Sequence, residues 1–353
     1  MLELHDAPLA PLTTLRLGGP ARRLVTATTD AEVVETVRSA DRSGEPLLVI
    51  GGGSNLVIAD EGFPGTVIHV NTRGIGYHEA PDGTVDVTVA AGEDWDGVVA
   101  TTVAEGLAGL ESLSGIPGRA GATPIQNVGA YGREVAEVIT QVRVYDRQDS
   151  RIQVIENEKC SFTYRSSLFK SASRYVVLDV TFRLARQALS MPVKYTELAT
   201  ELGVPLGDRA GVGEVRSAVL KIRARKGMVL SPGDPDTRSA GSFFTNPVLT
   251  TAEFTQVEAA AAARGAGPVP KYDAGTGRVK VPAAWLIEHA GFAKGHGAPG
   301  PARVSSKHTL ALINAGDATT ADLLALAREI VVGVRAAYDV TLTPEPILVG
   351  VSL

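Results

Sequence analysis

PLLVIGGGSNLVI, at residues 46–58, contains the pattern that decides the fold. A short apolar strand ends at Ile50, three glycines follow in succession, and a second apolar run begins at Leu56. These glycines lack the spacing of the dinucleotide-binding fingerprint, and no long helix follows them. Successive glycine N–H groups can point into one concavity that binds an anion, with Ser54 and Asn55 as further donors. A plain hairpin turn also selects glycine, so this loop alone leaves both interpretations open.

A second glycine-rich loop, SGIPGRAGATPIQNVGAYG at residues 114–132, favours the anion site. The loop is too long and irregular for a plain connection, so it predicts a function or a bound ligand. Its glycines and alanines allow the backbone to lie against a flat or extended ligand. Two such loops at the ends of strands in one unit together predict a long ligand with a diphosphate at its centre.

Periodicity and capping residues predict an alternation of strands and helices around the two loops. Thr29 and Glu32 form a capping box at the start of the first helix, and Asp94 begins the second, which Gly106 ends. Helices are predicted at residues 28–44, 94–106, 214–227, 250–265, 282–291 and 319–338. Strands are predicted at residues 65–70, 84–92, 138–146, 175–184, 309–314 and 346–353.

Composition narrows the class of protein. The chain has 353 residues and a net charge of −5, which argues against a general nucleic-acid binder because no basic excess offsets phosphates. The single cysteine, Cys160, excludes an internal disulfide framework and fits a small apolar filler. The N-terminus does not read as a signal peptide, and no apolar stretch reaches the ~18 residues of a membrane span. We therefore expect a cytoplasmic protein.

The two loops resemble the flavin-binding loops of the UDP-N-acetylenolpyruvoylglucosamine reductases. The stretches SFTYRSSLFK, RSAGSFFTNP and PAAWLIEHAGF resemble further motifs of that family, in the same order along the chain. Membership implies an α+β fold, with a two-part FAD-binding domain of the vanillyl-alcohol oxidase type and a C-terminal α+β substrate-binding domain. The expected divisions are residues 1–70 and 71–190 for the two FAD-binding subdomains and 191–353 for the substrate domain, whose last strand returns to the active site.

The resemblance also implies bound FAD, and NADPH as the hydride donor. We expect the FAD to be noncovalent, because neither glycine loop contains a histidine that could carry it. The implied FAD contacts are Gly51, Gly52, Gly53, Ser54, Asn55, Leu56, Ile116, Pro117, Gly118, Ala122, Thr123, Gly129, Tyr131 and Gly132. The implied reaction is the reduction of UDP-N-acetylglucosamine enolpyruvate to UDP-N-acetylmuramate in peptidoglycan precursor synthesis.

Three residues match the family's catalytic positions. Ser242 matches the donor of a proton to C2 of the enolpyruvyl group, a role that requires no histidine base. Arg165 matches the arginine that binds the substrate carboxylate, for which a planar and permanently charged guanidinium is suited. Glu345 matches the glutamate that works beside the serine. Ile347 stands where several members of the family carry a basic residue.

The resemblance implies substrate contacts at Tyr195, Lys226, Asn246 and Glu288, with Tyr195 in the subgroup that carries an extra tyrosine loop. A longer loop at residues 227–238 precedes the serine motif and reads as an ordered surface insertion. The stretch SSKH, at residues 305–308, has no assigned role.

Two other functions compete with this interpretation. A flavin-dependent sugar or alcohol oxidase could share the FAD fold, and a nucleotide-sugar-binding regulator could keep the fold without catalysis. The GSFFTNP motif argues against the oxidase, and Arg165, Ser242 and Glu345 argue against the regulator. The histidines show no metal-ligand spacing, so we expect no metal. We also expect a monomer, no membrane contact and no nucleic-acid partner.

Overall fold

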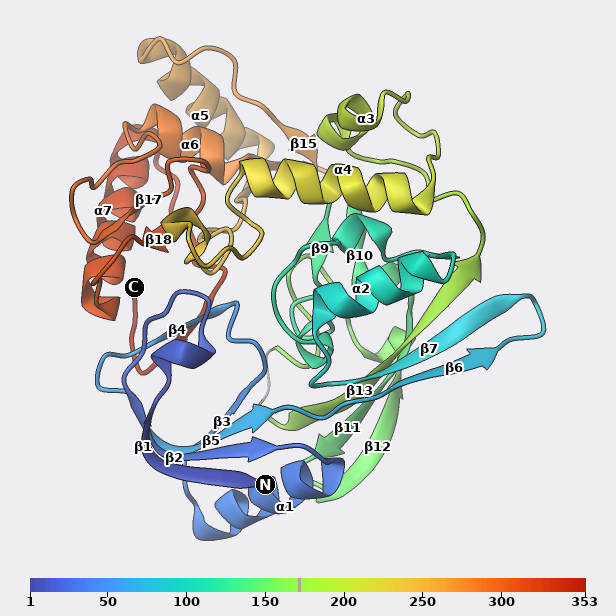
Figure 1. The fold of residues 1–353 in the computed structure, drawn as a ribbon. Coiled ribbons are helices and arrows are strands. Elements are labelled where there is room, and N and C mark those ends of the chain that lie inside the picture. Colours follow the sequence, from blue (N-terminus) through green and yellow to red (C-terminus); the bar gives the residue numbers. More distant parts are fainter. Residues whose placement is uncertain (171–172) are drawn as a thin grey trace. The chain divides into compact units, whose positions relative to one another are not determined.

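A computed structural model describes residues 1–170 and 173–353 of the chain (Figure 1). The contacts between residues divide the chain into two units, and the backbone passes repeatedly from one to the other. The first unit comprises Met1–Ala7, Ala21–Gly53 and Pro64–Arg225. The second comprises Pro8–Pro20, Ser54–Phe63 and Lys226–Leu353.

The first sheet of the first unit has four strands in the order β1-β2-β5-β3, with helix α1 in the same unit. Their bounds are β1 Leu2–Pro8, β2 Pro20–Ala27, β3 Leu47–Ile50, β5 Phe63–Val70 and α1 Asp30–Ser43. The predicted capping box is confirmed, since Glu32 N donates to Thr29 Oγ1 at 3.2 Å and the Glu32 carboxylate accepts from Thr29 N. Val33 and Val37 of α1 are fully buried, as their helical spacing indicates.

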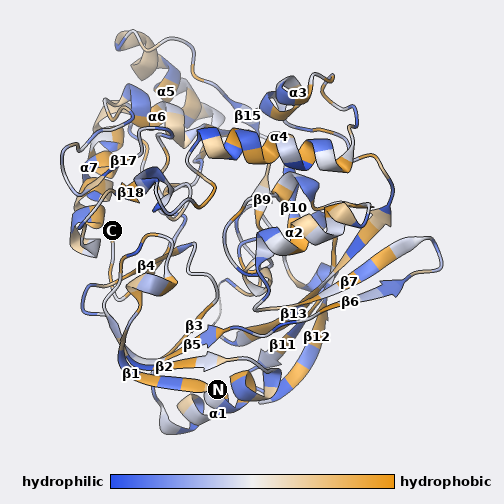
Figure 2. Ribbon diagram, in the orientation of Figure 1, coloured by the Kyte–Doolittle hydropathy of each residue, from blue (hydrophilic) through white to orange (hydrophobic). Residues whose placement is uncertain are grey.

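The second sheet of the first unit has six antiparallel strands, in the order β12-β11-β13-β7-β6 with β8 paired to β13. Their bounds are β6 Ile75–Glu79, β7 Thr84–Ala90, β8 Leu107–Ala108, β11 Ile139–Asp146, β12 Arg151–Glu156 and β13 Tyr175–Arg186. Hydrophobic and hydrophilic residues alternate along β7 (Figure 2), and Val85, Val87 and Val89 are all buried. Helix α2, Trp95–Ala104, begins at Asp94, whose carboxylate accepts from Gly97 N at 3.0 Å.

The expected boundary near residue 190 differs from the division of the contacts. Helices α3, Thr196–Leu202, and α4, Val212–Arg225, belong to the first unit. They enclose a small core of their own that includes Leu198, Val215 and Ile222. Arg216 of α4 also makes two hydrogen bonds to the Asp96 carboxylate of α2, at 2.6 and 2.9 Å. This segment therefore packs with α2 in the first unit.

The second unit combines short strands with three helices around a separate apolar core. Its elements are β4 Leu56–Ile58, β14 Val248–Thr250, β15 Tyr272–Asp273, β16 Arg278–Lys280, β17 Ala302–Val304, β18 Leu312–Asn314, β19 Ile347–Val349, α5 Thr251–Ala263, α6 Ala283–His289 and α7 Thr320–Tyr338. Strand β4 pairs in parallel with β19, so the last strand of the chain lies beside a segment from near its start. No helix in the described part of the chain is long and apolar enough to cross a membrane.

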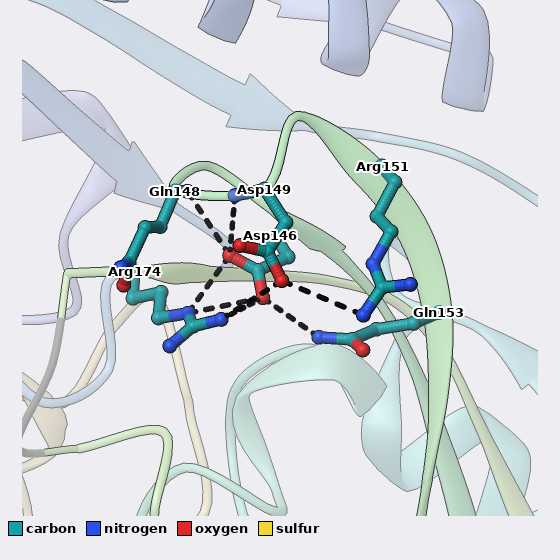
Figure 3. Close-up of polar contacts among 6 residues, drawn as sticks. All are labelled: Asp146, Gln148, Asp149, Arg151, Gln153 and Arg174. Atoms are coloured by element: carbon teal, nitrogen blue, oxygen red, sulfur yellow. Dashed lines mark hydrogen bonds and ion pairs between the residues drawn. The ribbon is translucent and has the colours of Figure 1, made fainter.

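A buried carboxylate holds the turn between β11 and β12 against the start of β13 (Figure 3). Asp146 is completely buried and accepts hydrogen bonds from Gln148 N at 3.0 Å and from Gln153 Nε2 at 2.7 Å. Arg174, which directly precedes β13, donates to both of its oxygens at 2.5 to 3.0 Å. The Arg174 guanidinium is the largest cause that lowers the pKa of Asp146 to about 2.

We predict that Asp146→Asn destabilises the chain at pH 7 by about 1–3 kcal/mol, because it removes a charge-assisted hydrogen-bond network. The folded-state pKa lies below the ordinary value of 3.8, so this stabilisation is present above about pH 4 and is lost as the pH falls toward 2. Thermal unfolding of the two proteins at pH 7 and at pH 3 tests this, and the difference in Tm should shrink at the lower pH. Asp149→Asn is the control, since Asp149 is partly exposed and pairs with Arg174 at 3.2 Å. A pH-independent difference would contradict the assignment.

Candidate active site

The first glycine loop, residues 51–55, connects β3 to β4 and is not a hairpin turn. The two strands belong to different sheets, because β3 pairs with β5 and β4 pairs with β19. A Cβ atom added to Gly52 would lie 2.8 Å from the Cα atom of Gly118, and one added to Gly51 would lie 3.0 Å from the Cβ atom of Arg119. The two glycine loops therefore touch backbone to backbone, and the contact explains why glycine is needed at both positions.

Hydrogen bonds from two helices fix the start of the second loop at Gly115. The Asp96 carboxylate of α2 accepts from Gly115 N at 2.6 Å, and Arg223 of α4 donates to Gly115 O at 3.1 Å. Arg216 in turn neutralises Asp96. Ile116, Pro117 and Gly118, which follow, are partly exposed, so this stretch has a fixed backbone and an accessible surface.

The middle of the second loop is more buried than its start. The Thr123 hydroxyl is buried and donates to Ala120 O at 2.7 Å, so it already has an internal partner. Gly121 packs so closely on Ala91 that an added Cβ atom would lie 2.5 Å from the Cβ atom of Ala91. Ala122 remains partly exposed. Thr123 therefore supports the loop from within, and the other predicted contacts in this part of the chain have more open surfaces.

Arg165 lies against the end of the second loop. Its Nη2 donates to Gly129 O at 2.7 Å, and its Nη1 lies 3.9 Å from a carboxylate oxygen of Glu134. The backbone of Arg165 adopts a left-handed conformation with φ of +53°, which costs free energy in a residue with a side chain. Lys170 donates to Arg165 O at 2.9 Å. The predicted carboxylate-binding residue and the predicted flavin loop are thus adjacent within the first unit.

Tyr195, predicted as a substrate contact, also lies against the second loop. Its ring meets the ring of Tyr131 edge to face, with the centroids 5.5 Å apart. A Cβ atom on Gly132 would lie 2.8 Å from the Cβ atom of Lys194, so the two segments pack closely. Burial, the largest cause, raises the pKa of Tyr131 to about 12. Tyr195 itself is 39% exposed, which leaves its ring accessible to a ligand.

The backbone segments that carry Ser242 and Glu345 lie side by side in the second unit. Glu345 N donates to the carbonyl of Phe243 at 2.9 Å, and Phe243 N donates to Leu310 O at 2.8 Å. Gly241, directly before the serine, has a φ of +74° that favours glycine. Asn55 of the first glycine loop donates from its side chain to Glu345 O at 3.4 Å. The structure therefore brings the two predicted catalytic residues of this unit together with one predicted cofactor contact.

The other three predicted substrate contacts have different local settings in the second unit. Asn246 accepts a hydrogen bond from Ala283 N at 2.9 Å and so satisfies the first turn of α6. Glu288 is exposed on the same helix. Lys226 follows α4 and precedes Gly227, whose φ is +67°. Their roles toward a substrate stay predictions.

Two motifs without an assigned role are joined in the structure. In the loop at residues 227–238, the Asp236 carboxylate accepts from Ser306 N at 2.8 Å and from Ser306 Oγ at 2.6 Å. Lys307 forms an ion pair with Asp234 of the same loop. The stretch SSKH therefore holds this loop in place, and Asp236 is buried. Sequence reasoning missed the contact because its partners lie 70 positions apart.

Comparisons with known proteins show which family this chain is similar to. Residues 21–156 match the family model described as an FAD binding domain, and residues 234–349 match that of the UDP-N-acetylenolpyruvoylglucosamine reductase C-terminal domain. The reductase of that name from Streptomyces coelicolor is 59% identical over 99% of this chain and 91% of its own length. The one from Thermobifida fusca is 56% identical over 99% and 98%. The crystal structure of the Thermus caldophilus reductase has a TM-score of 0.65 at 26% identity, and covers 99% of this chain and 98% of its own.

These matches confirm the resemblance inferred from the sequence, and with it the predicted α+β fold built from an FAD-binding part and a C-terminal domain. The individual site residues stay predictions, now with defined positions.

We predict that Gly52→Ala weakens the contact between the two loops, since the added methyl group would meet the backbone of Gly118. Overpacking of this kind costs about 1–3 kcal/mol. The expected result is a lower Tm and a lower flavin content of the purified protein. Gly76→Ala is the control, because an added Cβ atom at Gly76 meets nothing within 4 Å. Equal effects of both substitutions would contradict the prediction.

Proposed function

Because this chain belongs to the UDP-N-acetylenolpyruvoylglucosamine reductase family, and is therefore an FAD-containing oxidoreductase, we propose that it reduces UDP-N-acetylglucosamine enolpyruvate to UDP-N-acetylmuramate with NADPH as the hydride donor. The reaction belongs to peptidoglycan precursor synthesis. We further propose that the enzyme acts as a monomer in the cytoplasm. Besides the family, one observation supports the proposal: Glu345 N pairs with the carbonyl of Phe243, the residue after Ser242.

The residues of the first unit suit an FAD molecule. Gly51, Gly52 and the stretch from Ile116 to Gly118 are partly exposed, so a diphosphate and a flat ring could lie against their backbone. The first loop, with Ser54 and Asn55, would hold the diphosphate, and the partly exposed stretch from Ile116 to Gly118 would lie along the flavin. When bound, FAD supplies the hydride chemistry between NADPH and C3 of the enolpyruvyl group.

Arg165 binds and polarises the substrate carboxylate in this proposal. Hydride addition at C3 places negative charge on C2 and on the carboxylate, so a fixed positive charge there lowers the barrier. The hydrogen bond from Arg165 Nη2 to Gly129 O holds the guanidinium beside the second loop before substrate arrives. Such preorganisation reduces the cost of reorganising the site during the reaction.

Ser242 delivers the proton that C2 requires after hydride addition. An unshifted hydroxyl is a poor acid, so the transfer depends on the developing negative charge at C2 and on charged groups near the serine. Glu345 orients the enolpyruvyl group or passes the proton onward, from a backbone fixed to that of Phe243. Tyr195, Lys226, Asn246 and Glu288 contact the nucleotide sugar, with the exposed ring of Tyr195 covering it.

An anaerobic experiment with the two half-reactions separated tests the proposed function. The bound flavin is reduced with NADPH, excess NADPH is removed, and UDP-N-acetylglucosamine enolpyruvate is added while the flavin absorbance is followed. Rapid return of the oxidised spectrum is the expected result. A flavin that stays reduced until air is admitted would replace the reductase with an oxidase of the same fold.

Ser242→Ala should leave the reduction of flavin by NADPH nearly unchanged and slow the reduction of substrate by about 10²–10⁴-fold, because only the second half-reaction requires the proton. Stopped-flow absorbance of each half-reaction measures the two rates. The control is Thr245→Ala in the same segment. It removes a hydroxyl that donates to Thr343 O at 3.4 Å and has no assigned role. Equal slowing of both half-reactions by Ser242→Ala would refute the role of the serine.

A further inference from the structure

Arg119 lies in the second glycine loop and packs on the first. It directly precedes the short helix at Ala120–Ala122, and its Cβ and Cγ atoms lie 3.0 and 3.1 Å from the place where a Cβ atom on Gly51 would be. The stem of this side chain therefore covers one flank of the first loop. The side chain is 21% exposed, so its charged end is partly withdrawn from water.

The guanidinium of Arg119 lacks a close partner. Its nearest carboxylate is that of Asp94, at 4.0 Å, and Asp94 is itself 64% exposed and accepts from Gly97 N at the start of α2. Within the described residues, no hydrogen bond reaches the Arg119 side chain. A half-buried guanidinium with unmade hydrogen bonds costs free energy, and an anion that reached it would recover that cost.

The charges around Arg119 are of both signs: Arg73 is positive, and Asp94 and Glu93 are negative. His69 of β5 pairs with Ile50 of β3, the residue that precedes the first loop. Burial, and after it the charges of Arg119 and Arg73, lower the pKa of His69, so its imidazole adds no positive charge near pH 7. Burial lowers the pKa of Arg119, and the charge of Arg73 lowers it further. Burial of the guanidinium disfavours its charge, which an anion bound beside it would stabilise.

Arg73 provides a contrast, because its guanidinium is already satisfied. It donates to Gly92 O and, at 2.6 Å, to Asn71 Oδ1, and it pairs with Glu93 at 3.6 Å. The two arginines share a region of the first unit, yet only Arg119 packs on the glycine loop and retains its full hydrogen-bonding capacity among the described residues.

We propose that Arg119 binds the diphosphate of FAD, so that its guanidinium supplies charge where the first glycine loop supplies backbone N–H groups. This inference rests on the proposed function for the identity of the anion. A planar guanidinium can donate to two diphosphate oxygens at once, which a neutral loop cannot match in strength. Arg119 would thereby hold the cofactor without taking part in hydride or proton transfer.

The test compares the release of FAD from the full-length holoenzyme of wild type, Arg119→Gln, Arg119→Lys and Arg73→Gln. Each protein is diluted into low or high sodium chloride, and the recovery of flavin fluorescence reports the dissociation constant. We expect Arg119→Gln to weaken FAD binding by about 10- to 100-fold and to flatten its salt dependence, because a screened charge has been removed. Arg119→Lys should recover part of the affinity, and Arg73→Gln should stay within about threefold of wild type.

Riboflavin, which has no phosphate, separates loss of the diphosphate contact from loss of folding. Its affinity for the flavin-free chain should be the same for wild type and Arg119→Gln. Equal weakening of riboflavin and FAD, or unchanged FAD release by Arg119→Gln, would overturn the inference. A variant that retains FAD but requires more NADPH would instead assign Arg119 to the nucleotide donor and also overturn it. Failure of wild type itself to retain FAD would count against the proposed function.

Discussion

The space between Gly52 and Gly118 is too narrow for a methyl group, and the arrangement of the first unit follows from this contact. Strand β3 ends directly before the first glycine loop, and α2 begins beside the second, where Trp95 N donates to Gly118 O at 3.2 Å. The contact therefore ties the four-stranded sheet to the region of α2. Arg119 covers one flank of the first loop because its stem follows directly from Gly118.

The second loop also positions two residues that are predicted to contact substrate. Arg165 is fixed to Gly129, and Tyr195 is packed on Tyr131, so both depend on the path of one loop. Ser242 and Glu345 have a different support, since the backbone that carries them belongs to the second unit. The residue proposed to bind the carboxylate and the residues proposed to deliver the proton therefore have separate local supports in the chain.

The sequence predicted the helices well, because the signals that begin and end them are local. Capping boxes mark the starts of α1 and α5, where Thr250 and Glu253 repeat the arrangement of Thr29 and Glu32. Strands β1 and β2 were not predicted. Strand β1 is an edge strand in which only Ala7 is buried, so the alternation of its first residues marks no core face. The strand expected at residues 309–314 is limited to Leu312–Asn314, because Leu310 O accepts from Phe243 N instead.

The sequence motifs name candidate residues for the site, and these stay predictions, but the motifs give no indication of the contacts between them. Ser242 and Glu345 come from separate motifs, and nothing in the sequence indicates that Glu345 N bonds to the carbonyl of Phe243, the residue after Ser242. The contacts place α3 and α4 in the first unit, beyond the boundary expected near residue 190, and one of these contacts is that of Arg216 with Asp96, 120 positions away. Arg119 shows the same limit, since its lack of a close partner depends on where Asp94 and the first loop lie. Long-range placement of this kind has no local signal.

The parallel pairing of β4 with β19 has a consequence for the synthesis of the protein on the ribosome. Asn55 and Glu345, which meet at this junction, are 290 positions apart, so the partner of β4 is synthesised long after β4 itself. At translation rates of about 5–20 residues per second, β4 remains without its partner β19 for roughly 15–60 s. During that interval the nascent chain presents Val57 and Ile58, both buried in the finished protein, to the chaperones that bind exposed apolar segments.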